Sequence, residues 1–600
     1  MKEYFNIKRF AGKVHHMIGG VSVFSVVLLF FCFRQRSPFI YQTNDDLFLK
    51  MLVSGEMCGI CQTHLFHISY PVGVLLSGLY KLFPKFPWYG LFFCLVIGLV
   101  MAIILRLFLL LENSLLIRLV TLLLFMFFSY GFLFLHIAEL QFTVVAAIAG
   151  CGALFVFVLA PEADSYRKVL KNNIGFLLLS ACALCIRNQV FFMFLPFVGM
   201  IGFGKYLDAG KERARKCLIF LAGVFALMLI FLCAVEKLAY RGEDWRIFSA
   251  YNKARANIYD YEGFPDYDAY KTIYQELGIS RSSYEAAAHH YSIALESNID
   301  QKSMEVLEFI VKQERHLSYT EIWGKLQEMA VLFVERHLSY ADRPLNLLVY
   351  SCYILFFICG ILCRKKDVLR DIVFLGIARM FIWAYLLFYG RLPVRVSQSV
   401  YLAEFAVLLA IAFRSKVWEL REVSGNMGIQ KGTLARGFWS ISIIFLTFDC
   451  FCIGFPKAKA VAAEASSRLQ FSQAFVDIRD YFHAHPDKFY YLDMNSFSYF
   501  TEDALGKNRG QYDNFLYLGS WMPHSPWYEL KFNRAGISHP AEALYEDPNV
   551  YVVFMNAESI DDDYLQDFYD ENYSGVSLKI VERVDVSNGL QFLVMKGYAE

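Results

Sequence analysis

Eleven long apolar segments, separated by polar loops, constrain what this chain of 600 residues can fold into. A helix needs about 20 apolar residues to cross roughly 30 Å of hydrocarbon, and a single soluble core rarely uses so many long apolar runs. We therefore predict an α-helical polytopic membrane protein with about 11 transmembrane helices. The predicted spans are Met17–Phe33, Trp88–Leu111, Leu115–Leu135, Phe142–Ala160, Ile174–Ile186, Val190–Phe203, Cys217–Val235, Leu345–Cys363, Asp371–Tyr389, Ser399–Phe413 and Gly437–Phe455.

The loops between these segments alternate in positive charge, which predicts the orientation of the chain in the membrane. The residues before the first span are basic, which favours a cytoplasmic N-terminus. The alternation continues along the chain only if Arg187-Asn188-Gln189 separates two short spans. The odd number of spans then predicts an extracytoplasmic C-terminus. The first segment reads as an uncleaved signal anchor, because no small-residue cleavage site follows Phe33.

Two regions outside the spans have the composition of soluble domains. Ser280, just before a helical pattern, predicts the start of a helix in the first region. In the second, Asn588-Gly589 between two alternating runs predicts a β-hairpin. We predict four parts: a transmembrane module 1–235 containing the first outer loop 34–87, a helical outer loop 236–344, further transmembrane helices 345–455 and a small extracytoplasmic α/β domain 456–600.

Composition and motifs argue against several functional classes. No basic stripe or aromatic platform indicates nucleic-acid binding, and neither a P-loop nor a dinucleotide fingerprint is present. Cys58, Cys61, His64 and His67 offer four metal donors, but their spacing is more compressed than in a usual zinc finger. Incidental thiols or one disulfide are therefore the favoured interpretation of the two cysteines. A divalent cation is retained as the candidate cofactor.

An acidic pair follows the first span, in Asn44-Asp45-Asp46. The ordinary interpretation is a helix start, since Asn44 or Asp45 would be a good N-cap. The following residues, Asp46–Leu52, predict an amphipathic helix lying at the membrane interface, and Pro71 predicts the start of a juxtamembrane helix. Carboxylates this close to the bilayer also suit chemistry on a lipid-borne substrate.

The acidic pair is followed by Tyr70-Pro71-Val72-Gly73 and by Leu79-Tyr80-Lys81-Leu82-Phe83. Over about residues 15–200 this arrangement resembles the GT-C glycosyltransferases that use polyprenyl-phosphate sugars, such as protein mannosyltransferases and lipid A aminoarabinose transferases. The resemblance implies that Asp45 is the catalytic base, assisted by Asp46 and by an acid in the second outer loop. Glu139 occupies that place, where the family more often has Asp; its ordinary interpretation is a polar residue at a helix end.

Such a reaction also needs cations, because the leaving group is a lipid phosphate. The forked guanidinium of Arg matches phosphate oxygens. Arg391 and Arg395 lie on the predicted outer side, against the positive-inside rule, and Arg187 lies at the break between two spans. Contact with lipid headgroups is the alternative for each. His64, His67 and Tyr70 would line the acceptor side, and Asn44 is a further candidate substrate-binding residue.

These observations predict an integral membrane glycosyltransferase. It would transfer a sugar from a polyprenyl-phosphate donor to a cell-envelope glycan, lipid or protein outside the membrane. A transporter or flippase is the first alternative, since it could also have short broken helices with charges, although no inverted repeat is visible. The second is a polymerase or ligase of envelope polysaccharides, which would not need an acidic pair beside the first span.

Overall fold

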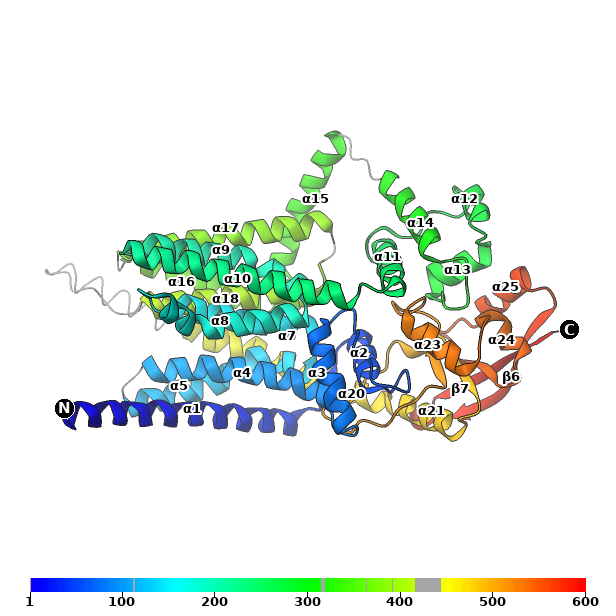
Figure 1. The fold of residues 1–600 in the computed structure, drawn as a ribbon, viewed down its shortest axis with the longest axis horizontal. Coiled ribbons are helices and arrows are strands. Elements are labelled where there is room, and N and C mark those ends of the chain that lie inside the picture. The colour runs from blue at the N-terminus through cyan, green and yellow to red at the C-terminus, as the bar shows by residue number, and fades with distance from the viewer. Residues whose placement is uncertain are drawn as a thin grey trace.

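The computed structural model describes residues 2–111, 114–314, 319–362, 364–390, 392–415 and 444–599. Long helices run side by side, and the C-terminal domain gathers at one end of the bundle, opposite the N-terminus (Figure 1). We call this the domain end. Within the described residues, ten segments are long and apolar enough to cross a membrane, which confirms the polytopic helical class. They lie in α1 (Lys2–Arg36), α4 (Trp88–Leu111), α5 to α6 (Leu115–Ala138), α7 (Phe142–Leu159), α8 (Tyr166–Ile186), α9 (Asn188–Asp208), α10 (Glu212–Ala239), α16 (Leu345–Leu362), α17 (Lys366–Tyr389) and α18 (Val394–Ser415).

The predicted break at Arg187 is confirmed. Arg187 is extended, with φ −153° and ψ 101°, and separates α8 from α9. Lys205, near the end of α9, donates to the carbonyl of Ala160 at 2.7 Å, and Arg213 donates to the carbonyl of Asp164 at 3.1 Å. These contacts bring the start of α8 and the end of α9 to one end of the bundle, so Arg187 turns the chain at the other, domain end.

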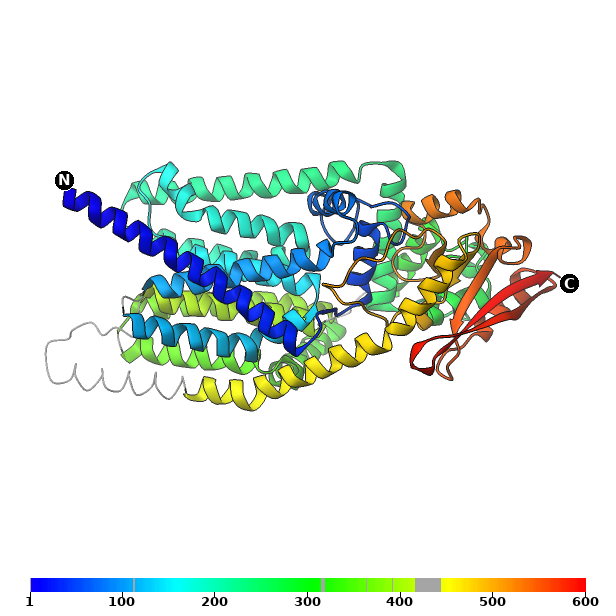
Figure 2. The same ribbon diagram turned by 90° about the horizontal axis from the view of Figure 1, so that it is seen from below.

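The eleventh predicted span, Gly437–Phe455, lies partly outside the described residues. From residue 444 the chain is helical, and it passes through a π-turn, Cys450–Gly454, into α20 (Phe455–Phe471). Seen from below, this stretch runs obliquely from the bundle to the C-terminal domain (Figure 2).

The first two loops of the domain end are joined by a short parallel pair of strands. β1 (Ile40–Tyr41) pairs with β2 (Glu139–Leu140), with Ile40 opposite Glu139. After β1 come α2 (Asn44–Ser54) and α3 (Tyr70–Leu82), and α3 has Pro71 in its first turn as predicted.

Helix α2 does not lie at a membrane interface, and this prediction is wrong. All of its residues from Asp46 to Ser54 are buried. Phe48 packs against Tyr517 of the C-terminal domain at 4.7 Å between ring centroids, and Lys50 bonds to Glu502 of the same domain at 2.7 Å. Lys50, whose charge suggested a solvent-exposed face, instead contacts the C-terminal domain.

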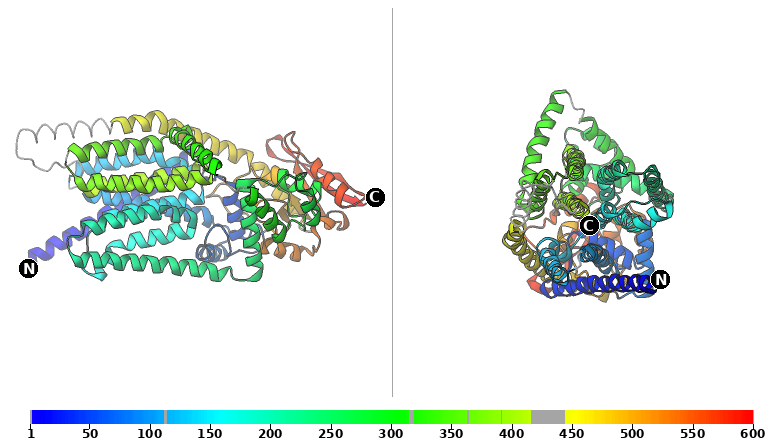
Figure 3. Two further views of the ribbon diagram at one scale, coloured as in Figure 1. Left: turned by 90° about the horizontal axis from the view of Figure 1, so that it is seen from above. Right: turned by 90° about the vertical axis from the view of Figure 1, so that its left-hand side faces the viewer.

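The loop 236–344 is helical. It contains α11 (Glu243–Asn257), a π-turn (Ile258–Glu262), α12 (Lys271–Glu276), α13 (Arg281–His290), α14 (Gln301–Glu314) and α15 (Tyr319–Leu338). Ser280 caps α13 by accepting from the amide of Ser283 at 3.1 Å, as the sequence predicted. Helix α15 crosses the direction of the spans and projects from one side of the bundle (Figures 1 and 3).

The C-terminal domain is a five-stranded sheet with helices, which confirms its predicted α/β class. Its strand order is β4-β3-β5-β7-β6, with β4, β3 and β5 parallel. The elements are α21 (Gln473–Ala484), β3 (Phe489–Leu492), α22 (Met494–Phe497), β4 (Phe515–Tyr517), α23 (Pro526–Ala535), α24 (Pro540–Glu546), β5 (Val550–Met555), α25 (Asp563–Asn572), β6 (Val576–Asp585) and β7 (Gln591–Ala599). Asn588 and Gly589, at φ 64° and 70°, turn the predicted hairpin.

Candidate functional site

The two acids at the start of α2 have different surroundings. Asp46 is fully buried and accepts from the Thr43 hydroxyl at 2.9 Å, the Phe142 amide at 3.1 Å and the Tyr89 hydroxyl at 3.2 Å. Burial raises the pKa of Asp46 to about 8, although these donors oppose the shift. Asp46 therefore ties α2 to α4 and α7. The expected N-cap is also corrected, because Thr43 occupies that position and not Asn44 or Asp45.

Asp45 is half-buried, and its contact comes from the far end of the chain. The indole N–H of Trp521 donates to Oδ1 of Asp45 at 3.1 Å. Trp521 precedes α23 in the C-terminal domain and is 4% exposed. Within the described part of the chain, no hydrogen bond reaches the other carboxylate oxygen, Oδ2. That oxygen is free to accept a proton from a bound group.

Arg187 and His67 meet beside this carboxylate. The guanidinium of Arg187 donates to Nδ1 of His67 at 3.2 Å and lies over the Phe142 ring at 5.0 Å. The His67 ring contacts Trp521 at 4.6 Å. The backbone explains the approach, since the amide of Ser69 donates to the carbonyl of Cys185 at 2.8 Å and so fastens the first loop to the end of α8.

Electrostatic coupling extends the group to two further arginines. Burial lowers the pKa of His67 well below its usual value, and the charges of Arg187, Arg255 and Arg395 lower it further. Burial also lowers the pKa of Arg187 to about 10, against the opposing charge of Asp45. We call Asp45, His67, Arg187, Arg255 and Arg395 the carboxylate–arginine cluster. Arg391, the other predicted arginine, lies outside the described residues.

Glu139 lies in β2, next to the first loop, but its side chain pairs with Arg468 and not with a residue of the cluster. Its Oε1 lies 3.6 Å from the guanidinium of Arg468 on α20, and Gln42 donates to its Oε2 at 3.4 Å. Burial raises the pKa of Glu139, Glu464 adds to the rise, and Arg468 opposes it. The contacts of Glu139 thus lead to α20 and not to Arg187.

The remaining predicted residues form an aromatic group next to the cluster. His64 stacks on Trp245 at 4.7 Å and contacts Tyr70 at 4.9 Å, and its Nε2 lies 3.2 Å from the carbonyl of Ala239. These contacts give His64 and Tyr70 a packing role at the end of α10. Asn44 is half-buried in the first turn of α2.

The described residues contain no group of three His, Cys, Asp or Glu side chains arranged to hold a metal. Cys58 and Cys61 are both unpaired thiols. Gln511 donates to the sulfur of Cys61 at 3.7 Å, and Arg534 donates to the carbonyl of Cys58 at 2.9 Å. The first loop is thus held to the C-terminal domain at these positions by hydrogen bonds.

A cavity of about 310 Å³ adjoins the cluster. Its walls include Phe66 and Asn188, the sequence neighbours of His67 and Arg187, and also Glu236 and Lys237. Leu184 and Leu232 of α8 and α10 form part of its apolar side. The cavity thus has both polar and apolar walls, and Phe66 connects it to His67 of the cluster.

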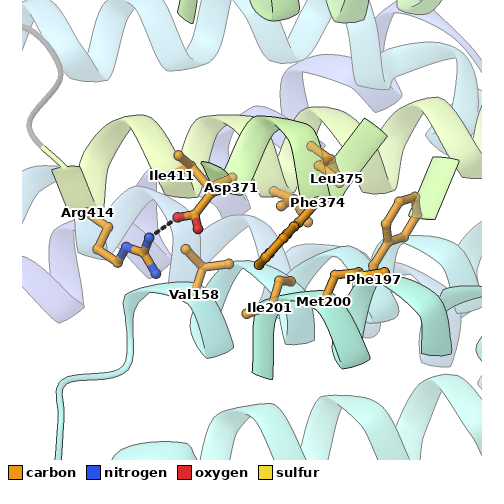
Figure 4. Close-up of a pocket in the computed structure, with 10 residues that line it drawn as sticks. Val158, Phe197, Met200, Ile201, Asp371, Phe374, Leu375, Ile411 and Arg414 are labelled. Carbon is orange, nitrogen blue, oxygen red and sulfur yellow. Dashed lines mark hydrogen bonds and ion pairs between the residues drawn. The ribbon is translucent and has the colours of Figure 1, made fainter. Parts of the chain in front are cut away.

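A second cavity lies between α9, α17 and α18, near the other end of the bundle (Figure 4). Its volume is about 20 Å³, and Arg414 forms an ion pair with Asp371 at its edge. A space of this size holds about one water molecule. It is too small for a sugar or a lipid headgroup.

Sequence reasoning missed Trp521 and Arg255. Trp521 is separated from Asp45 by 476 positions, and no local pattern marks it. Arg255 lies on α11, in an outer loop that the sequence predicted to be helical without marking any residue of this segment. Only the docking of the long loop and the C-terminal domain brings these residues to the first loop.

Comparison with known proteins gives a structural likeness. No family model and no curated protein matches the chain. The crystal structure of ArnT from Cupriavidus metallidurans bound to undecaprenyl phosphate is similar, with 10% sequence identity and a TM-score of 0.34 over 96% of this chain and 97% of that chain. A likeness with a TM-score this low carries no argument about activity, which depends on this chain's own residues.

Proposed function

We propose that this protein is an integral membrane glycosyltransferase that transfers a sugar from a polyprenyl-phosphate donor to an acceptor of the cell envelope on the extracytoplasmic side. The observation that carries the proposal is the carboxylate–arginine cluster. The half-buried carboxylate of Asp45, whose Oδ2 accepts no hydrogen bond within the described residues, lies in the electrostatic field of Arg187, and the charges of Arg187, Arg255 and Arg395 all act on the neighbouring His67.

In the proposed reaction the carboxylate accepts a proton and the arginines stabilise the leaving phosphate. An acceptor hydroxyl attacks the anomeric carbon, the bond from that carbon to the lipid phosphate oxygen breaks, and the hydroxyl proton passes to Oδ2 of Asp45. The phosphate leaves as an anion, which Arg187 and Arg395 stabilise by charge and hydrogen bonds. Because Arg187 already donates to His67, the imidazole orients the guanidinium.

The adjoining cavity suits a substrate with a lipid part. Leu184 of α8 and Leu232 of α10 form part of its apolar wall, and Phe66, which also lines it, contacts His67 of the cluster. A polyprenyl chain could lie against the spans while its phosphate reaches the arginines. Glu139 and Asp46 have supporting roles in this scheme, through the β1–β2 junction and the first turn of α2.

The location of the cluster favours this function over transport. A transporter is expected to bind its substrate near the bilayer midplane. Helix α2, which carries Asp45, instead lies where the bundle meets the C-terminal domain (Figure 1), and Asp45 bonds to Trp521 of that domain. A buried intramembrane ion pair between Arg379 and Glu404 does exist. It joins α17 to α18 and lies among aromatic rings.

The test is transfer by purified protein in lipid vesicles. Polyprenyl-phosphate donors carrying labelled pentoses or hexoses are supplied with extracted envelope acceptors, and labelled product is measured. Transfer that requires the lipid-linked donor, and is not supported by nucleotide sugars, is the expected result. Movement of the labelled lipid across the bilayer without any transfer would instead support the flippase alternative.

The predicted orientation has its own test. A reporter fused after Glu600 should be active only outside the cytoplasm, because the charge alternation predicts that the C-terminal domain lies there. A cytoplasmic signal would put the cluster on the wrong side for an envelope acceptor and would reject the proposal.

A further inference from the structure

The chain just before Trp521 is held on both sides. The amide of Leu518 donates to the carbonyl of Leu492 at 2.8 Å, which fixes it to strand β3. Its carbonyl accepts from the amides of Ile293 and Ala294, each at 2.9 Å, which fixes it to the long loop 236–344. Two regions far apart in sequence therefore set the position of this segment.

The backbone at Gly519 and Ser520, the next two residues, is tightly constrained. A Cβ on Gly519 would lie 2.0 Å from the carbonyl oxygen of Tyr291, so only glycine fits beneath the long loop. Ser520 has φ +80°, a left-handed conformation that is uncommon for a residue with a side chain. The chain turns sharply here and directs the indole of Trp521 toward the first loop.

At the end of this turn, Trp521 contacts two members of the cluster. Its N–H donates to Asp45, and its ring meets His67 at an angle of 70°. An indole N–H is a donor only. It can hold the carboxylate oxygen Oδ1, but it cannot compete with Asp45 for a proton.

We propose that Trp521 is a positioning residue for Asp45, so that the C-terminal domain, clamped by the long loop, completes the site. This inference rests on the proposed function. Trp521 holds Oδ1 and leaves Oδ2 directed to the acceptor hydroxyl. Loss of the N–H should therefore reduce the rate of proton transfer and leave donor binding at the arginines intact.

The neighbouring Trp527 provides a matched control. It is 2% exposed and packs against Trp521 at 5.6 Å, but its own indole nitrogen has no hydrogen-bond partner within the described residues. Trp521→Phe and Trp527→Phe remove the same atoms from the same part of the core. Only the first removes a donor to Asp45.

The kinetic experiment uses the full-length protein in nanodiscs. Trp521→Phe should lower kcat by about tenfold or more, as expected for a hydrogen bond to a charged group, with the KM for the lipid-linked donor unchanged. Trp527→Phe should stay within about twofold of wild type, because it removes no such bond. Equal losses in both variants, or full activity in Trp521→Phe, would overturn the positioning role.

A spectroscopic measurement separates this inference from the proposed function. The protein is labelled with 5-fluorotryptophan, and Trp521→Phe identifies the Trp521 resonance by its disappearance. Asp45→Asn should move that resonance and leave the Trp527 resonance in place. An unmoved Trp521 resonance would reject the contact. If wild type transfers no sugar while the resonance moves, the proposed function fails and the contact between the domains stands.

Discussion

Helix α2 contributes one residue to each of two groups of charges, Lys50 to the first and Asp45 to the second, and both groups contact the C-terminal domain. The first is a quartet of Lys50, Glu56, Arg479 and Glu502, which is almost fully buried and contains two cations and two carboxylates. The second is the carboxylate–arginine cluster, in which Asp45 is half-buried and the charges of Arg187, Arg255 and Arg395 all act on His67. The quartet is balanced and closed to solvent, whereas the cluster has an excess of positive charge. An excess of this kind is suited to an anionic ligand.

The contacts of the quartet indicate a role in stability and not in ligand binding. Lys50 lies 2.6 Å from Glu56 and 2.7 Å from Glu502, and Arg479 pairs with Glu502 as well. The backbone amide of Arg509 donates to the other oxygen of Glu56 at 2.8 Å. Breaking a buried pair leaves an uncompensated charge, which typically costs about 3–5 kcal/mol. The quartet thus fastens the first loop to the domain that supplies Trp521.

The largest effect is expected at the cluster. Asp45→Asn should reduce sugar transfer by about a hundred- to ten-thousandfold, because a proton-accepting carboxylate contributes that much, while the melting temperature of the purified protein stays close to that of wild type. Asp46→Asn is the matched control, since an amide can still accept from Phe142 and Tyr89 and can donate to Thr43. Retained transfer by Asp45→Asn would remove the base from the scheme.

The second prediction concerns the quartet. Lys50→Met should destabilise the fold by about 3–5 kcal/mol, since it leaves two carboxylates beside one buried cation. Thermal unfolding in detergent measures the loss. The double variant Lys50→Met with Glu502→Gln keeps one cation and one carboxylate, so it should lose less than the sum of the two single variants. Additive losses would show that the four charges do not act together.

The third prediction tests the excess of positive charge. Arg395→Lys keeps the charge but loses the fork, and should reduce transfer by about tenfold, while Arg395→Ala should reduce it further. The readout is the KM for the polyprenyl-phosphate donor together with kcat. Arg167→Ala, an exposed arginine at the opposite end of the bundle, serves as the control. Equal activity of Arg395→Ala and Arg167→Ala would exclude a role for Arg395 at the lipid phosphate.

The fourth prediction is a pH dependence of stability from Asp46. Its pKa is raised to about 8 in the fold by burial, against about 3.9 in an unfolded chain. A raised pKa stabilises the fold below the unfolded value, and this contribution is lost as the pH rises toward 8. The melting temperature of wild type should therefore fall between about pH 4 and pH 8 and change little above that.

Asp46→Asn should flatten this dependence, because an amide does not titrate. The comparison with Asp487→Asn, a change at an exposed acid, shows whether any acid would have the same effect. A wild-type melting temperature that does not change over this pH range would contradict the buried protonated state.

Local signals in the sequence were sufficient for much of the fold. Apolar length predicted the spans, and charge alternation required the break that Arg187 makes between α8 and α9. Asn588-Gly589 predicted the hairpin because a tight turn needs φ above zero at both central positions. In each case the signal lies within a few residues of the structure that it predicts, so no information from the rest of the chain was needed.

The exposure of α2 and the surroundings of Asp45 and Asp46 depend on which distant segments pack against them. The residues near them in the sequence do not carry this information. Lys50 gave α2 the pattern of an interfacial helix, but its charge pairs with carboxylates, one of them more than 400 positions away. Asp45 and Asp46 are adjacent and chemically identical. Only the packing of α4 and α7 buries the second, and only the C-terminal domain brings an indole to the first.

The sequence by itself therefore determined the polytopic helical class of this protein, the order of its spans and their number to within one over the described residues, and the residue types available for chemistry at one end. The tertiary structure decided which of those residues meet. The physical reason is one of range: hydropathy, turn preference and capping act over a few residues, whereas burial and charge pairing depend on neighbours supplied by distant segments.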